Sequence, residues 1–318
     1  MKTVFLLLSF IVASGHFVHA QQGESIRRIG YLDTGFKPLK EFSDAIHKLG
    51  YVDGQNITFE YRSAEREERL AELVSDLIQR NVSVIVASGA AAGLAARAAT
   101  KTIPIVYLGG GDPISLGLAA SLAHPGDNVT GITELSPELM AKRLELLKEA
   151  FPKISHVAVI AVRGAPGIAE QLETLERHGR GLQLKLRMIE ISGSGDIENS
   201  LLAGIKQGAS ASIEVPNPFF HANSAHIVKF ALQHKLPSIF HSKDFVEVGG
   251  LMAYGANFPE LYRRAAGLLD KILKGTKPAE LPVEQPTKFE LVINLKTANQ
   301  LGLTIPPNVL ARADRVIK

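Results

Sequence analysis

Short apolar runs alternate with longer amphipathic runs along most of the chain. Residues 82–87 are almost uniformly apolar and mostly β-branched, as expected of a buried strand whose sheet is covered by helices on both faces. Residues 66–80 repeat their leucines at helical spacing, which predicts an amphipathic helix. This βα rhythm predicts a parallel, doubly wound sheet with right-handed crossovers. The elements predicted in the first half are strands at 29–32, 56–61, 82–87 and 103–108, and helices at 39–49, 66–80 and 93–100.

After a break at residues 128–131 the sequence predicts a helix from residue 136 that ends before Phe151, and its apolar stripe is Met140, Leu144 and Leu147. A second series of the same kind then begins at Val157. The two series are similar in size but share no direct repeat, so we expect two lobes of similar architecture. The other elements predicted here are strands at 157–160, 184–191, 212–215 and 238–240, and helices at 168–178, 197–206, 225–234 and 262–273.

The tail after residue 273 has a different pattern. Five prolines interrupt it, at positions 278, 282, 286, 306 and 307. Proline punctuation of this kind favours an irregular strap across an existing surface over a third domain.

The first twenty residues are typical of an export signal. Lys2 precedes an apolar stretch at residues 4–13, and Val18 and Ala20 occupy the −3 and −1 positions of a small-residue cleavage site. A buried amino-terminal strand or helix is the alternative interpretation. We predict a signal peptide over residues 1–20, cleavage after Ala20 and a mature protein in the periplasm. The chain has no cysteine, which excludes disulfides, thiol catalysis and a lipoprotein anchor.

Composition and charge narrow the class of protein. The 318 residues are 46% hydrophobic and 21% charged, which suits a globular chain of two medium domains. The formal charge is +3, it falls to +2 without Lys2, and no basic run is clustered. We therefore expect no nucleic acid partner.

The motifs of common catalytic and cofactor sites are missing from the sequence. There is no Gly-x-Ser-x-Gly elbow and no His-Glu-x-x-His, and the Gly109-Gly110-Gly111 run lacks the Gly-Lys-Ser/Thr of a phosphate loop. His221 and His226 lack a third ligand at a convincing spacing. We expect no cofactor, no metal and no catalytic residue.

A set of segments in a fixed order spans essentially the whole mature chain. They are Leu49-Gly50-Tyr51-Val52-Asp53-Gly54-Gln55-Asn56, Ile103-Pro104-Ile105-Val106, Asp112-Pro113, Asn128-Val129-Thr130-Gly131, Lys142-Arg143-Leu144-Glu145-Leu146-Leu147-Lys148, Gly249-Gly250-Leu251-Met252 with Tyr254-Gly255, and the stretch from Leu281 through Leu303-Thr304-Ile305-Pro306-Pro307. In these segments the chain resembles the ABC-transporter substrate-binding family whose best-known members bind tryptophan and related aromatic amino acids. The resemblance implies an α/β, type I periplasmic-binding-protein fold, in which two doubly wound parallel-sheet lobes are joined by crossing strands.

The same resemblance suggests how the chain is divided. It implies crossings near residues 130–135, 252–256 and 278–286. We assign residues 21–134 and 253–278 to lobe 1, and residues 135–252 and 279–318, with the C-terminal strap, to lobe 2. The implied partners are a small-molecule ligand in the interlobe cleft and an ABC permease in the inner membrane, and we expect a monomer.

Five segments qualify as cleft residues independently of the resemblance, because ligands of open α/β sheets bind at the carboxyl ends of strands. The segments are 33–35, 88–91, 109–113, 165–167 and 216–220. The helix start after Ser88 and Gly89 offers free N–H groups to a carboxylate, although a tight packing turn would read the same. With the crossing strands, the candidate ligand-binding residues are Thr34, Gly35, Ser88, Gly89, Ala90, Asp112, Pro113, Thr130, Ala165, Asn217, Phe219 and Tyr254.

Several of these candidates have two possible roles. Asp112 suits a ligand ammonium or the N-cap of a helix opened by Pro113. Phe219 and Tyr254 suit the face of a flat ligand or the core. The loops Arg163-Gly164-Ala165-Pro166 and Asn217-Pro218-Phe219-Phe220 depart from the family pattern, which predicts a shift in ligand specificity.

The sequence thus predicts a periplasmic solute-binding protein of an ABC importer. Its ligand is expected to be a small organic molecule, an amino acid or a similar zwitterion with an aromatic or bulky apolar side chain. The alternatives are a periplasmic sensing protein that partners a sensor kinase, and a small-molecule enzyme.

Overall fold

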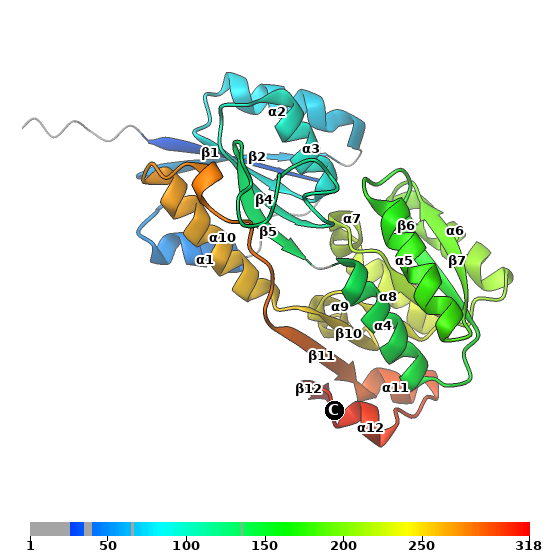
Figure 1. Cartoon of the computed structure of the whole chain (residues 1–318). Coiled ribbons are helices and arrows are strands. Elements are labelled where there is room, and N and C mark those ends of the chain that lie inside the picture. The colour runs from blue at the N-terminus through cyan, green and yellow to red at the C-terminus, as the bar shows by residue number, and fades with distance from the viewer. Residues whose placement is uncertain (1–25, 35–39, 65–66, 135) are drawn as a thin grey trace, which may run out of the picture.

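Two α/β lobes make up the computed structural model, which describes residues 26–34, 40–64, 67–134 and 136–318 (Figure 1). The predicted signal peptide and Gly35 lie outside the described residues. Within those ranges no helix is long and apolar enough to cross a membrane.

The first lobe is built on a parallel sheet in the order β2-β1-β3-β4-β5. Side chains alternate between the sheet's two faces, so that Tyr31 packs in one apolar cluster and Leu32 in the other. Helices α1 and α10 cover the first face, and α2 and α3 cover the second. The elements are β1 (Arg27–Asp33), α1 (Lys40–Lys48), β2 (Ile57–Ser63), η1 (Glu67–Arg69), α2 (Leu70–Gln79), β3 (Val84–Ser88), α3 (Ala90–Ala99), β4 (Ile105–Gly110), β5 (Val129–Glu134) and α10 (Phe258–Leu273).

The second lobe has a larger sheet, in the order β12-β11-β10-β9-β8-β6-β7. All neighbours are parallel except β10 and β11. Its elements are α4 (Ser136–Ala150), β6 (His156–Val162), α5 (Ile168–Gly181), β7 (Lys185–Ile191), η2 (Ser194–Asp196), α6 (Ile197–Lys206), β8 (Ala211–Glu214), α7 (Pro218–Ala222), α8 (Ser224–Gln233), β9 (Ser238–Phe240), α9 (Lys243–Glu247), β10 (Met252–Ala256), β11 (Phe289–Asn294), α11 (Leu295–Leu301), α12 (Pro307–Leu310) and β12 (Arg315–Ile317).

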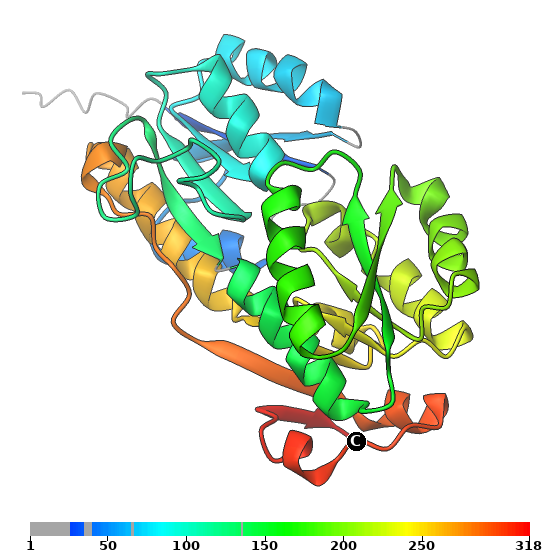
Figure 2. The same cartoon turned by 45° about the vertical axis from the view of Figure 1, so that its right-hand side comes forward.

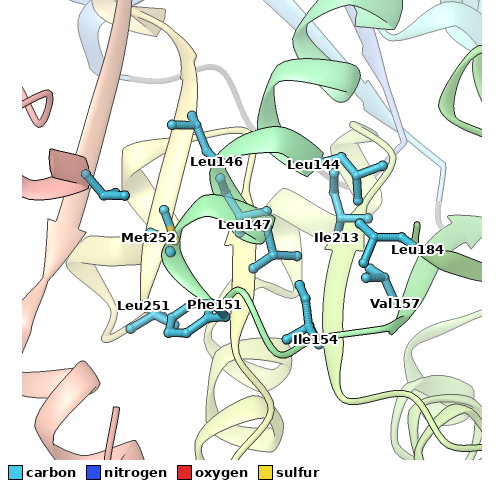
Figure 3. Close-up of a cluster of buried hydrophobic side chains, with 14 of the residues drawn as sticks. Leu144, Leu146, Leu147, Phe151, Ile154, Val157, Leu184, Ile213, Leu251 and Met252 are labelled. Atoms are coloured by element: carbon cyan, nitrogen blue, oxygen red, sulfur yellow. The ribbon is translucent and has the colours of Figure 1, made fainter. Parts of the chain in front are cut away.

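Helix α4 supplies much of the core of the second lobe. Its Leu144 and Leu147 are fully buried in one cluster with Ile213 of β8 and Met252 of β10 (Figure 3). Burying a side chain of this size contributes about 1.5–3 kcal/mol. The apolar stripe predicted from the sequence is therefore the face that anchors α4 on the sheet.

In the part of the chain that the structure describes, three connections join the lobes: β5 to α4, β10 to α10, and the segment between η3 (Pro278–Glu280) and β11. In the third, Glu284 donates its N–H to the Gly131 carbonyl (2.8 Å) and accepts from the Thr133 N–H (2.9 Å). The segment thus pairs with the edge of the first sheet before it enters the second sheet as β11 (Figure 2).

The predicted lobe boundaries differ from the sheets in two places. We placed residues 253–256 in lobe 1, but β10 pairs with β9 and β11 of the second sheet. We placed residues 279–284 in lobe 2, but Leu281 packs in the core of the first lobe. The expected irregular strap was also wrong in part, because β11, α11, α12 and β12 are regular elements and both strands extend the second sheet.

Candidate functional site

Two adjoining cavities lie between the lobes, with about 620 Å³ and 520 Å³ of space unfilled by atoms, including their open mouths. Both are lined by Gly89 of the first lobe and by Pro216, Asn217 and Pro218 of the second. We call the first the aromatic cavity; its other lining residues are Ser88, Leu108, Gly109, Ile132, His221, His241, Phe258, Leu261 and Tyr262. We call the second the polar cavity; its other lining residues are Thr34, Glu67, Ala90, Ala91, Ala92, Val162, Ala165, Pro166, Ile168, Gln171 and Val215.

Strand ends position the cleft. Ser88 is the last residue of β3, and Gly109 is the next-to-last residue of β4. In the second lobe Pro216 follows β8 and His241 directly follows β9. The cavities therefore lie at the carboxyl ends of the parallel strands of both sheets, where ligands of open α/β sheets bind.

The start of α3 faces the polar cavity. Gly89 is the N-cap residue with φ +92° and ψ 158°, a conformation that favours glycine, and no side chain among the described residues caps the helix. The Gly89 N–H itself donates a hydrogen bond to the Leu108 carbonyl (2.7 Å). The N–H groups of the first turn after Gly89 have no acceptor within the helix, so this end of α3 suits an anion. The helix begins at Ala90, three residues earlier than predicted.

Polar side chains complete the polar cavity. Asn217 accepts the Phe219 N–H with its Oδ1 (2.9 Å), which leaves its amide NH₂ to donate. The Gln171 Oε1 is buried and has no hydrogen-bond partner among the described residues. The pKa of Glu67 is raised, mainly because its side chain is partly buried and also because the negative charge of Glu68 lies nearby. The polar cavity thus combines donors at α3 and Asn217 with acceptors at Glu67 and Gln171.

The aromatic cavity has a mostly apolar lining with two histidines. Phe258 and Tyr262, from the start of α10, lie 6.3 Å apart between ring centroids. The His221 Nε2 lies 2.9 Å from Asp244 Oδ2, and the His241 Nδ1 lies 2.6 Å from Glu214 Oε1. Burial alone would raise the pKa of Asp244, but the hydrogen bond and charge of His221 outweigh it and the pKa is lowered. Across the described ranges, no group of three or more His, Cys, Asp or Glu side chains is placed to hold a metal ion.

Six of the predicted ligand-binding residues line one of the two cavities, and a seventh lies outside the described residues. Thr34, Gly89, Ala90, Ala165 and Asn217 line the polar cavity. Ser88 lines the aromatic cavity, together with Gly89 and Asn217. Gly35 lies outside the described residues.

The structure gives Asp112 and its neighbour Pro113 a local role outside both cavities. Asp112 caps the following turn, since its carboxylate accepts the N–H groups of Ile114 and Ser115 (3.1 Å each). The Pro113 carbonyl accepts the Leu118 N–H (2.8 Å). Of the two roles predicted for Asp112, the structure supports the cap and offers no support for the ammonium partner.

Three more candidates are packed away from the cavities. Thr130 is fully buried and donates its hydroxyl to the Leu281 carbonyl (3.0 Å), which fixes the third interlobe connection. Phe219 packs against the second lobe's core, 5.5 Å from the Phe220 ring. Tyr254 lies 6.2 Å from the Phe289 ring because β10 pairs with β11. Arg163 is exposed and lies 3.4 Å from Glu190, as a solvated residue at the edge of the lobe.

Sequence reasoning missed most of the cavity's side chains. His241 follows a correctly predicted strand, so the strand-end rule would have selected it. Phe258, Tyr262 and Gln171 come from helix faces, and no strand-end signal marks them. His221 was considered only as a metal ligand.

A two-lobed α/β chain with a ligand-sized cleft at its strand ends has the architecture of the type I periplasmic binding class. The sequence also matches the family model of the ABC transporter substrate binding protein over residues 33–317. The chain therefore belongs to the ABC transporter substrate-binding protein family.

Known proteins agree with this assignment. The chain is 28% identical over 269 residues to a tyrosine-binding protein of Clostridioides difficile, covering 84% of this chain and 77% of that protein. It is similar to the crystal structure of an ABC domain from Streptococcus pneumonia in complex with L-Trp, with a TM-score of 0.82, 25% identity, and coverage of 92% of this chain and 100% of that one. A conserved domain protein from Vibrio cholerae has a TM-score of 0.82 and 26% identity, with coverage of 92% and 99%.

Proposed function

We propose that this chain is the periplasmic solute-binding component of an ABC importer and that it captures an aromatic α-amino acid between its lobes. One observation carries the proposal: a cavity with polar side chains and the start of α3, which no described side chain caps, adjoins an aromatic cavity at Gly89 and Pro216–Pro218. An aromatic amino acid has the same division into a charged head and a flat apolar body. The tyrosine-binding relative and the L-Trp complex support this class of ligand.

The polar cavity suits the zwitterionic head. The first-turn N–H groups of α3 and the Asn217 amide would donate to the carboxylate, favoured by the helix dipole. Glu67 and the Gln171 Oε1, which line this cavity, would accept from the ammonium. Both charges would then be paired when the lobes exclude water, which a buried ion requires.

The aromatic cavity suits the side chain. Phe258 and Tyr262 offer ring faces and edges, and Leu108, Ile132 and Leu261 offer aliphatic surface. Aromatic pairs gain about 0.5–1.5 kcal/mol beyond their buried area. The proposal places the ring here and the head at α3.

The carboxylate requirement can be tested with matched ligands. We expect isothermal titration calorimetry to detect L-tryptophan, L-tyrosine or L-phenylalanine, and the corresponding amine (tryptamine, tyramine or phenethylamine) to bind about 10- to 100-fold more weakly. The amine keeps the ring and the ammonium and lacks only the carboxylate. L-Leucine serves as the control without a ring. Equal binding of amine and amino acid would contradict the placement of the head, and no binding by any aromatic amino acid would overturn the proposed function.

Gly89 is expected to control how closely the lobes approach. A Cβ at this position would lie 3.0 Å from Pro218 Cγ of the other lobe, and φ +92° is strained for alanine. Gly89→Ala should lower the affinity for the tightest amino acid of the panel about tenfold, because the clash is relieved when the lobes move apart. Calorimetry of Gly54→Ala is the control: its φ of +79° gives the same kind of strain, with no atom within 4 Å. An affinity loss of equal size in Gly54→Ala would show that strain alone is responsible.

The amino-terminal sequence bears on where the protein works. We propose export, cleavage of the signal peptide after Ala20 and diffusion of a monomer in the periplasm, where the loaded protein docks on its permease. The apolar stretch at residues 4–13 and the lack of cysteine support a cleaved signal without a lipid anchor.

A further inference from the structure

His241 is the most deeply embedded polar group of the aromatic cavity. It follows β9, and its side chain is 5% exposed. The Glu214 Oε1 accepts from the His241 backbone N–H (2.8 Å) and lies 2.6 Å from its Nδ1. The residue is therefore fixed at two points by a single oxygen.

His241, and next a buried arginine, keep Glu214 ionised. The Glu214 side chain is fully buried, and Arg143 of α4, also fully buried, donates its Nε to the Tyr254 carbonyl (2.7 Å). Burial alone would raise the pKa of Glu214, but the charges of His241 and Arg143 and the hydrogen bonds of His241 outweigh it and the pKa is lowered. A carboxylate only accepts hydrogen bonds, so the Nδ1 of His241 must carry the proton.

This arrangement leaves the Nε2 of His241 for the cavity. No group of the described residues hydrogen-bonds to Nε2, and two rings lie close to the imidazole: His221 is 5.8 Å and Phe258 5.7 Å away between centroids. A well-packed core histidine would instead have both nitrogens paired, because a polar nitrogen facing apolar surroundings is costly. The Nε2 of His241 is thus an oriented polar atom in a cavity whose lining is mostly apolar.

We propose that the Nε2 of His241 hydrogen-bonds a hydroxyl group on the ring of the ligand, so that the site selects a hydroxylated aromatic amino acid over its unsubstituted analogue. A hydroxyl both donates and accepts, so it pairs with Nε2 whether the imidazole is neutral or protonated. Glu214 and Arg143 act as positioning residues, because they fix the tautomer and the orientation of His241 without lining the cavity. The inference rests on the proposed function and adds the substituent that the site recognises.

L-Tyrosine and L-phenylalanine form the matched pair for the test, since they differ by one hydroxyl. In calorimetry the wild-type protein should bind L-tyrosine at least about tenfold more tightly, because the smaller ligand leaves Nε2 unpaired. His241→Phe should bring the ratio of the two affinities close to one. His226→Phe is the control, because His226 pairs with exposed Glu198 at 3.1 Å and lines neither cavity; it should keep the wild-type ratio.

A second measurement needs no variant and covers the case in which His241→Phe does not fold. In nitrogen NMR spectra of the wild-type protein, the Nε2 resonance of His241 should shift on addition of L-tyrosine and stay in place on addition of L-phenylalanine. Equal affinities for the two ligands, or a tyrosine preference that persists in folded His241→Phe, would overturn the inference and leave the proposed function intact. Failure of both ligands and of L-tryptophan to bind would instead overturn the proposed function.

Discussion

Replacing Gly131 with alanine is expected to destabilise the protein by more than about 4 kcal/mol, a loss seen only when a specific structural requirement is broken. Gly131 lies in β5 with φ +151°, opposite Tyr107 of β4. A Cβ there would lie 2.0 Å from the Tyr107 carbonyl oxygen and 2.6 Å from its nitrogen. Backbone atoms cannot rotate away as a side chain would, and on the other side Glu284 hydrogen-bonds to the Gly131 carbonyl. The alanine would therefore separate two paired strands.

Urea unfolding of purified Gly131→Ala, or its loss to the insoluble fraction, measures this effect. The matched control is Gly267→Ala in α10, where no atom lies within 4 Å of the added Cβ. This control should be neutral or slightly stabilising, because alanine is favoured over glycine inside a helix by up to about 1 kcal/mol. Similar stabilities for the two variants would show that β5 can move away from β4 at little cost.

Gly131 also illustrates why sequence segments shared with a family need not mark the ligand site. In the segment 128–131, the Asn128 amide donates to the Ile103 carbonyl (2.7 Å), Thr130 holds the third connection, and Gly131 permits the close approach of β4. We included Thr130 among the ligand-binding candidates on its position near a crossing. Its fully buried hydroxyl instead joins segments about 150 residues apart, and such a contact is set by tertiary packing.

Most of the fold could be predicted because the apolar period differs between strands and helices. The uniformly apolar run at 82–87 became the buried strand β3, and the stripe of Leu144 and Leu147 became the buried face of α4. Strand β11 was missed because three prolines of the tail precede it and two follow, and its pairing with β10 depends on partners 33 to 41 residues away. Local pattern cannot supply that pairing.

The candidate site could be predicted only as far as strand ends determine it. The rule found Gly89, Ala165 and Asn217 because parallel strands end at one edge of a sheet. It could not pair Glu214 with His241, because that contact requires β8 and β9 to be neighbours in register, with Ile213 opposite Ile239. The position of Glu214 in strand β8, next to the apolar Ile213, nevertheless indicated a buried polar contact, since an ionised group is rarely buried without a partner.

Glu214→Gln is expected to lower the free energy of unfolding at pH 7 by about 3–5 kcal/mol. Glutamine keeps the shape and can still accept the His241 N–H, but it carries no charge. The fully buried Arg143 would then lose the negative charge beside it, and an uncompensated buried cation is strongly destabilising. Glu198→Gln is the matched control, because Glu198 also pairs with a histidine, but its side chain is 60% exposed and that of His226 39% exposed. That variant should change stability by at most about 1 kcal/mol.

The pH dependence separates loss of charge from loss of shape in Glu214→Gln. The pKa of Glu214 is lowered in the folded protein, so its charge stabilises the native state above the unfolded pKa of about 4.3. That stabilisation is lost as the pH falls below this value and through the lower folded pKa, because the native carboxylate then takes up its proton. Glutamine does not titrate. The difference in unfolding free energy between wild type and Glu214→Gln, measured in urea from pH 7 to pH 3, should therefore be largest at pH 7 and should shrink below about pH 4.3. Other lowered carboxylates, such as Asp244, are present in both proteins and cancel in the difference. A difference that stays constant with pH would mean that glutamine disrupts packing, and that the charge of Glu214 does not hold Arg143 and His241 in place.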